Sequence, residues 1–313
     1  MAPRQLKSFG PLLTYKIMHR LFAILLLSTL AAAQAGAEPP AQAAATASAP
    51  APENDNGKKA RAMIDTAVQA LGGQAYLTSQ NRGEEGRLYS LHHGESRGTG
   101  VQYRQFYRFP DRDRLEIIGR GNVLVPLPLV GIIVVSHDKK NKNDIVIIHN
   151  GDKGYETTYK GTAAQDKEEL GPYLRRRRHS LEQVLRKWIN DPTMQYFYDG
   201  LAIVDSTPTD QVTLLNSQND AVSIYLDQNT HLPLKTSYTW RDPTDKQKNT
   251  EEEVYDNYRL VQGIRTPHSI TRYFNGETSQ QRFINVAKYN LPLPDALFDA
   301  DVTYDPQAPP KKH

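Results

Sequence analysis

Many short runs of β-branched and aromatic residues, joined by tight turns, are the feature that most restricts how this chain can fold. Asn150-Gly151, Asn219-Asp220, Gln262-Gly263 and Asn275-Gly276 separate such runs. Asn-Gly is the strongest local signal for a hairpin turn. Consecutive hairpins predict an antiparallel meander, and a meander of this many strands must curl. The expected strands are 100–109, 114–118, 144–150, 154–159, 194–204, 211–216, 221–226, 234–240, 254–260, 264–274 and 278–289.

Two segments have helical rather than strand periodicity. The first runs from Lys58 to Leu71 and ends at Gly72-Gly73, which suits a helix C-cap. The second begins at Pro172, a residue suited to a first helical turn, and runs to about Ile189. The predicted fold class is therefore mainly β: a curled antiparallel sheet, or incomplete β-barrel, with two covering α-helices.

The N-terminal segment 1–37 has the layout of an export signal. A basic stretch precedes an apolar run from Leu21 to Leu30, and small residues of A-x-A type follow as far as Ala37. The apolar run is shorter than the roughly 20 residues of a membrane span, so we predict a cleavable signal rather than an anchor. The expected location is the periplasm, with secretion as the alternative. Either Met1 or Met18 could be the start, and the basic residues are Arg4, Lys7, Lys16 and Arg20.

The remaining chain divides by composition. Residues 38–57 are rich in Ala and Pro and predict a disordered linker, 58–303 predict one β-rich domain, and 304–313 predict a disordered tail. Four of the 38 basic residues lie in the signal, which leaves 34 against 35 acidic ones. This balance gives no reason to expect a nucleic-acid partner. No other stretch is long and apolar enough for a span, so we do not expect an integral membrane protein.

Cysteine is absent, which removes several classes of chemistry. Disulfides, thiolate metal sites and thiol catalysis are excluded, and so is a lipid anchor on a cysteine at the cleavage point. The chain also lacks H-E-x-x-H, G-x-S-x-G and P-loop motifs. Glu251-Glu252-Glu253, which follow a lysine-rich turn, are interpreted as a solvated hairpin end. We therefore predict no catalytic residue, no metal and no cofactor.

A curled sheet lined with aromatic side chains can enclose a ligand cavity. An ordinary packed core is the alternative for any one of these side chains. The segment 123–135, VLVPLPLVGIIVV, is apolar and broken by prolines, so it must be covered by protein, a ligand or a membrane. It is interpreted as a loop over the core, as a lip on a lipid-accepting cavity or as a partner contact. The candidate ligand-binding residues are Leu124, Leu127, Leu129, Val130, Tyr107, Tyr155, Trp240, Tyr258 and Phe274.

Four consecutive arginines, Arg175, Arg176, Arg177 and Arg178, lie on the second predicted helix. Four consecutive helical residues point in all directions, so a solvated helix face is one interpretation. Contact with anionic lipid headgroups or with a partner protein is the other, because clustered arginines attract such groups.

Five short motifs follow one another along 60–300: Ala70-Leu71-Gly72-Gly73; residues 150–155; Asp227 with 231–235; 256–259 with 263–267; and 290–298, which contains Leu293, Asp295 and Phe298. Together they resemble the exported proteins related to outer-membrane lipoprotein-sorting carriers, which have the LolA/LolB-like fold. This resemblance implies an incomplete antiparallel barrel capped by helices, with an apolar cavity for acyl chains.

The functional hypothesis is a non-enzymatic periplasmic binding protein that holds a lipid or the acyl chain of a lipoprotein in an apolar half-barrel cavity. One alternative is an envelope-stress sensor or protein-interaction module of the same fold, with an envelope protein as partner. A second alternative is an enzyme whose site is built from loops.

Overall fold

The computed structural model describes residues 54–92, 95–96, 98, 100–118 and 144–306, all within the unit Ala49–His313. The predicted signal at 1–37 and the apolar segment with Leu124, Leu127, Leu129 and Val130 lie outside the described residues. The predicted boundaries at 38, 58 and 304 stay predictions.

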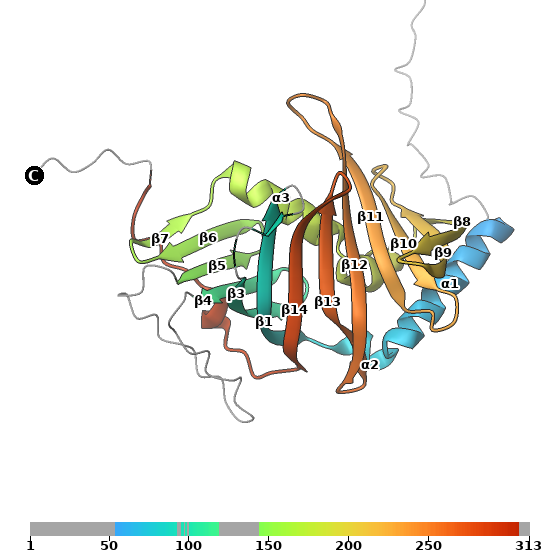
Figure 1. The fold of residues 1–313 in the computed structure, drawn as a ribbon, viewed down its shortest axis with the longest axis horizontal. Coiled ribbons are helices and arrows are strands. Elements are labelled where there is room, and N and C mark those ends of the chain that lie inside the picture. The colour runs from blue at the N-terminus through green and yellow to red at the C-terminus, as the bar shows by residue number, and fades with distance from the viewer. Residues whose placement is uncertain (1–53, 93–94, 97, 99, 119–143, 307–313) are drawn as a thin grey trace, which may run out of the picture. The chain divides into compact units, whose positions relative to one another are not determined.

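One antiparallel sheet dominates the described part of the chain (Figure 1). Its strands are β1 (Asn81–His92), β2 (Glu95–Ser96), β3 (Val101–Arg108), β4 (Arg112–Ile118), β5 (Ile145–Asn150), β6 (Lys153–Thr158), β7 (Gly161–Ala164), β8 (Gln195–Val204), β9 (Thr207–Leu215), β10 (Ala221–Asp227), β11 (Pro233–Arg241), β12 (Lys248–Val261), β13 (Ile264–Phe274) and β14 (Glu277–Tyr289). Their order is β7-β6-β5-β4-β3-β1-β14-β13-β12-β11-β10-β9-β8, with β2 paired to β1 beside this path. Because β7 and β8 end this order, the sheet is open, and the predicted curled antiparallel sheet is confirmed.

The tight turns form where the sequence predicts them. Asn275 and Gly276 join β13 to β14 with φ of 51° and 82°, and Gln262 and Gly263 join β12 to β13 with φ of 50° and 83°. Two successive positive φ values are the requirement of the turn that matches the twist of a hairpin. The structure adds three strands that the sequence does not predict, namely β1, β2 and β7.

The helices are α1 (Asp55–Leu71), α2 (Gln74–Thr78), α3 (Lys167–His179) and α4 (Leu181–Arg186), with 3-10 turns η1 (Trp188–Asn190) and η2 (Asp295–Phe298). Helix α1 begins three residues before the predicted start, because the Asn54 side chain accepts a hydrogen bond from the Gly57 N–H at 2.8 Å. It ends at Gly72, where φ is 129° and an added Cβ would lie 2.5 Å from the Gly263 carbonyl oxygen. Glycine is therefore required at this position.

The predicted single helix from Pro172 to Ile189 is wrong in two respects. It begins earlier, at Lys167, because the Asp166 side chain accepts from the Glu169 N–H at 2.9 Å and caps the N-terminus. It also breaks at Ser180, whose ψ of 147° ends α3 and whose hydroxyl accepts from the Gln183 N–H, starting α4. Pro172 consequently lies inside α3 rather than in its first turn.

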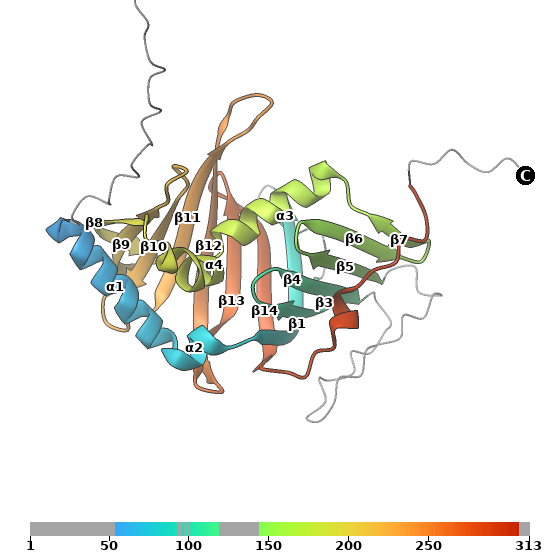
Figure 2. The ribbon, with the colours of Figure 1, turned by 180° about the vertical axis from the view of Figure 1, so that it is seen from behind.

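Helices α1, α2, α3 and α4 all lie across the same face of the sheet, which we call the inner face (Figure 2). The main core lies between this face and α1 and α4, where apolar side chains are removed from water. A smaller core of Phe106, Leu293, Leu297 and Phe298 lies on the opposite face, where the C-terminal segment packs. The main core includes Ala60, Ile64, Ala67, Val68, Leu185, Val212, Leu214, Val222, Ile224, Tyr255 and Ile270.

The free edge of the sheet at β8 is partly covered by a side chain of α1. The Asn56 amide nitrogen donates to the Tyr198 carbonyl at 2.9 Å, and the Tyr198 N–H donates to the Asn56 amide oxygen at 2.8 Å. Beyond this contact, Leu201 and Ile203 are 74% and 75% exposed on the same strand. An edge strand with unpaired backbone groups is open to pairing with another chain, and Asn56 removes one such position.

None of the helices in the described residues combines the length and the apolar character needed to cross a membrane.

Candidate ligand-binding site

The central part of the inner face is charged rather than apolar. On β12 and β13, Arg272 Nε lies 2.5 Å from Glu253 Oε1, and Arg272 Nη1 donates to Gln280 Oε1 of β14 at 3.0 Å. Two residues along β14, Arg282 Nη1 lies 3.0 Å from Oε1 of Glu84, a side chain of β1 that is 1% exposed. Paired charges therefore form a polar floor where the sequence predicts an aromatic-lined apolar interior. Each of these buried charges is stabilised by an opposite charge on a neighbouring strand.

A pocket of about 460 Å³ lies between α3 and strands β11 to β14. Its volume falls in the range of small-molecule sites. Trp240, Phe274 and Tyr238 supply aromatic surface, whereas Glu253 and Arg272 belong to the polar floor. The pocket also contacts Pro172, Arg175, Arg176, His179, Ser180, Thr236, Glu251, Glu252, Tyr273, Ser279 and Gln280.

Arg175 joins the helix to the aromatic wall of the pocket. Its Nε lies 3.1 Å from Glu251 Oε1, and its guanidinium carbon lies 3.4 Å from the centre of the Trp240 ring. A cation over the face of an indole is attracted by the negative charge of the ring face. The charge of Arg175 is therefore stabilised both by the carboxylate of Glu251 and by the face of the Trp240 ring.

Arg176, the next residue, is not matched in this way. Its nearest carboxylate oxygen is Glu251 Oε2, at 4.0 Å from Nη1. Its side chain donates no hydrogen bond to any of the residues that the structure describes. Burial, and next the positive charge of Arg272, lower the pKa of Arg176, although Glu251 acts in the opposite direction. Arg176 is thus a cation in an unfavourable environment.

His179 holds the C-terminal end of α3 against the sheet. Its Nδ1 donates to the Arg175 carbonyl at 2.7 Å, and its Nε2 lies 2.5 Å from Asp220 Oδ1 in the turn between β9 and β10. The imidazole stacks on Tyr238 with ring centres 4.1 Å apart. Burial first, and then the charge of Glu251, raise the pKa of Tyr238, so its hydroxyl stays neutral at ordinary pH.

The other side of α3 is tied to the β5–β6 turn. Arg177 Nη1 donates to the Gly151 carbonyl at 2.6 Å, and Arg177 Nη2 lies 3.0 Å from Asp152 Oδ1. Arg178 Nε lies 3.4 Å from Asp220 Oδ2. These two arginines line a second, more polar hollow of about 620 Å³, where both of them already have acidic partners. The C-terminal half of α3 is therefore tied to the sheet on two sides, at the β5–β6 turn and at the β9–β10 turn.

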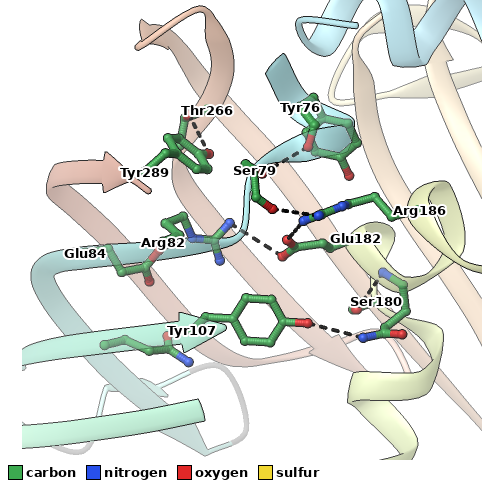
Figure 3. Close-up of polar contacts among 12 residues, drawn as sticks. Tyr76, Ser79, Arg82, Glu84, Tyr107, Ser180, Glu182, Arg186, Thr266 and Tyr289 are labelled. Atoms are coloured by element: carbon green, nitrogen blue, oxygen red, sulfur yellow. Dashed lines mark hydrogen bonds and ion pairs between the residues drawn. The ribbon is translucent and has the colours of Figure 1, made fainter. Parts of the chain in front are cut away.

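A polar network links α4 to the end of α2 and to β1 (Figure 3). Arg186 Nη2 donates to the carbonyls of Leu77 and Ser79 at 3.1 and 2.6 Å, and Arg186 Nη1 lies 2.8 Å from Glu182 Oε1. Glu182 in turn lies 4.0 Å from Arg82 Nη1 on β1. Free carbonyls at the C-terminal end of α2 thus receive donors from a distant helix.

The structure brings together some of the residues predicted to bind ligand and separates others. Trp240 and Phe274 line the pocket beneath Arg175 and Arg176. The predicted residues that lie elsewhere are Tyr107, whose hydroxyl donates to the Pro110 carbonyl; Tyr155, on β6; and Tyr258, whose hydroxyl donates to the Pro233 carbonyl. Their role in binding stays a prediction.

Two further interpretations are corrected. Glu251, Glu252 and Glu253 are not a solvated hairpin end: they lie within β12, and Glu251 is buried. The four arginines are not uniformly a solvated face: Arg175 and Arg177 are 20% and 15% exposed and are paired with acidic side chains, whereas Arg178 is 58% exposed. Their contact with a headgroup or a partner stays a prediction. The pocket residues missed by the sequence analysis include Glu251, Glu253, Arg272, His179 and Gln280. The one available signal was the alternation Glu251, Glu253, Tyr255, which places these side chains on one face of a strand.

The sequence matches no protein-family model and no curated protein. Solved structures similar to this chain include a DUF1329 family protein from Desulfovibrio piger (12% identity, TM-score 0.48, 77% of this chain and 97% of that chain). They also include an outer membrane lipoprotein-sorting protein domain from Vibrio parahaemolyticus (9%, 0.47, 78% and 97%). A LolA superfamily protein from Nitrosomonas europaea is a third (11%, 0.45, 77% and 97%). The names of the last two are those of the family that the sequence motifs resemble.

Proposed function

We propose that this chain is an exported, non-enzymatic binding protein that holds one lipid-like amphiphile in the pocket beneath α3. The observation that carries the proposal is the pocket of about 460 Å³ in which an aromatic wall and a charged floor face the same space. Export is supported by the signal-like sequence of residues 1–37.

The two walls favour a ligand with two chemically different parts. Trp240 and Phe274 offer apolar surface to a hydrocarbon body. The floor of Glu253 and Arg272 would lose hydration without compensation if a purely apolar chain filled the whole pocket. An amphiphile avoids this cost, because its polar end can lie on the floor. The pocket thus differs from the predicted apolar cavity, and the proposed ligand differs accordingly from a bare acyl chain.

A binding role is favoured over catalysis by the state of the acidic groups. Glu251 is paired with Arg175, and Glu253 with Arg272. Burial by itself raises the pKa of Glu253, but the charge and the hydrogen bond of Arg272 outweigh it and lower this pKa to about 2. A carboxylate of this kind is a poor proton acceptor near neutral pH.

Tryptophan fluorescence tests the proposal directly, because the chain has only two tryptophans, Trp188 and Trp240. In Trp188→Phe, a fatty acid brominated along its chain should quench the fluorescence of the remaining Trp240 in a saturable manner. The matched variant Trp240→Phe reports from Trp188, which is buried in the main core behind His179 rather than in the pocket lining, and should be quenched less. Equal and non-saturable quenching in both variants would refute a site at this pocket. Native mass spectrometry of the protein purified from its own envelope should also show a bound amphiphile.

A further inference from the structure

We infer that the pocket selects an amphiphile with an acidic head group, either a carboxylate or a phosphate ester, and that Arg176 is the residue that binds this group. The inference rests on the proposed function, since it concerns the ligand of the same pocket.

The first argument is the charge balance around the pocket. Arg175 is paired with Glu251 at 3.1 Å, and Arg272 with Glu253 at 2.5 Å. The third acidic lining residue, Glu252, is paired with Lys235 at 3.0 Å. Strand alternation puts that pair on the opposite face of the sheet from Glu251 and Glu253.

Arg176 is the cation that remains once these pairs have been made. Glu251, its nearest acidic neighbour, is already engaged at shorter range by Arg175. On the face of the sheet that carries the pocket, Arg175, Arg176 and Arg272 bring three positive charges against the two negative charges of Glu251 and Glu253, so one positive charge, on α3, is in excess. An anion is the ligand charge that this excess favours.

The second argument is the condition of the Arg176 guanidinium itself. About 35% of its side chain is accessible, so a ligand can reach it. The surrounding protein nevertheless removes enough water, and Arg272 adds enough like charge, to lower the pKa of Arg176. A partly desolvated cation without a hydrogen-bond acceptor is costly. A bound carboxylate or phosphate supplies both the missing charge and the missing acceptors, and the planar guanidinium can bind either of them with two parallel hydrogen bonds.

A cationic head group is disfavoured by the same arrangement, because it would add a like charge beside Arg176 and Arg272.

The experiment compares three probes that share one hydrocarbon body: lauric acid, lauryl phosphate and dodecanol. Each is titrated by isothermal calorimetry into the full chain, into Arg176→Gln and into Arg178→Gln. Arg178 is the matched control, because it lies two residues further along α3, is 58% exposed and is paired with Asp220 outside the pocket. Circular dichroism melting of each variant establishes that it is folded.

We expect the unmodified chain to bind at least one acidic probe about tenfold more tightly than dodecanol, the value of roughly one charge-assisted hydrogen bond. Arg176→Gln should remove this preference, because it weakens binding of the acidic probe far more than binding of dodecanol, whereas Arg178→Gln should leave the preference as it is. Arg176→Lys, which keeps the charge, should retain part of the preference. The ratio between lauric acid and lauryl phosphate identifies which acidic group is favoured.

The outcomes separate this inference from the proposed function. Equal binding of all three probes, or a preference for acids that survives Arg176→Gln, would overturn the role of Arg176 while leaving an amphiphile pocket in place. Failure of all three probes to bind would overturn the pocket's proposed function, and the inference with it.

Discussion

Replacement of Arg186 with methionine should destabilise the protein far more than the same replacement at Arg178. The side chain of Arg186 is 5% exposed, donates to two backbone carbonyls at the end of α2, and is paired with Glu182 at 2.8 Å. Its guanidinium carbon also lies 3.9 Å from the centre of the Phe109 ring. Methionine retains much of the aliphatic stem but none of the donors.

The expected loss in the free energy of unfolding follows from the partners of Arg186 that the substitution leaves unpaired. Each hydrogen bond from a charged donor contributes about 1.5–3 kcal/mol, and removal of one partner of a buried ion pair costs about 3–5 kcal/mol. These terms overlap, because Glu182 retains the more distant Arg82 at 4.0 Å. We therefore expect Arg186→Met to lower the free energy of unfolding by about 3–5 kcal/mol. Arg178 is 58% exposed with one ion pair at 3.4 Å, and its replacement should cost less than about 1 kcal/mol.

Equilibrium urea denaturation, followed by far-ultraviolet circular dichroism, measures both values. A similar loss of stability in the two variants would show that the network under α4 contributes no more than a surface ion pair. If Arg186→Met does not fold, Arg186→Lys provides the comparison, because lysine keeps one donor group and should recover part of the loss.

Three further predictions concern other parts of the chain. Arg272 lowers the pKa of Glu253 to about 2. Above the usual carboxyl pKa of about 4.3, the pair should therefore stabilise the fold by about 3 kcal/mol, and this contribution should be lost as the pH falls towards 2. The urea midpoints of the native chain and of Glu253→Gln should converge over the same pH range. Phe298→Ala should cost about 3–5 kcal/mol in the same assay, because this fully buried side chain belongs to the small outer core, and a cost below about 1 kcal/mol would mean that the C-terminal segment does not hold the sheet. Asn56→Ala should expose the backbone of Tyr198 and increase self-association in sedimentation velocity; an unchanged sedimentation profile would contradict this.

The turns and most strands could be predicted because their signals are local. Asn275-Gly276 and Gln262-Gly263 each need only their own backbone preference to define a hairpin. Strand β1 gave no such signal, since it contains Glu84 and Glu85 side by side and few apolar residues. It lies in the middle of the sheet because distant residues neutralise it: Arg104 Nη2 lies 2.7 Å from Glu85, and Arg282 lies 3.0 Å from Glu84. Such pairing cannot be read from a single segment.

Only part of the candidate site could be predicted, because its charged residues are also paired with residues far away in the sequence. Trp240, Phe274 and the arginines of α3 are conspicuous in the sequence, and the structure places several of them in one pocket. The acidic residues of β12 were misinterpreted because a run of three glutamates after a lysine-rich turn is usually solvated. Their burial depends on Arg175 and Arg272, which lie 76 and 19 residues away from Glu251 and Glu253. Only the folded sheet reveals this complementarity.

The contact between Asn56 and Tyr198 has a consequence for how the sheet ends. The carboxamide of asparagine is chemically a single peptide group, and here it offers one donor and one acceptor to the side of β8 that faces away from β9. Asn56 therefore terminates the sheet at this position: its side chain makes the hydrogen bonds that a further strand would make, but it offers no backbone to which another strand could pair. A strand from another chain could pair with β8 at Tyr198 only after the Asn56 side chain, and with it the first turn of α1, had been displaced.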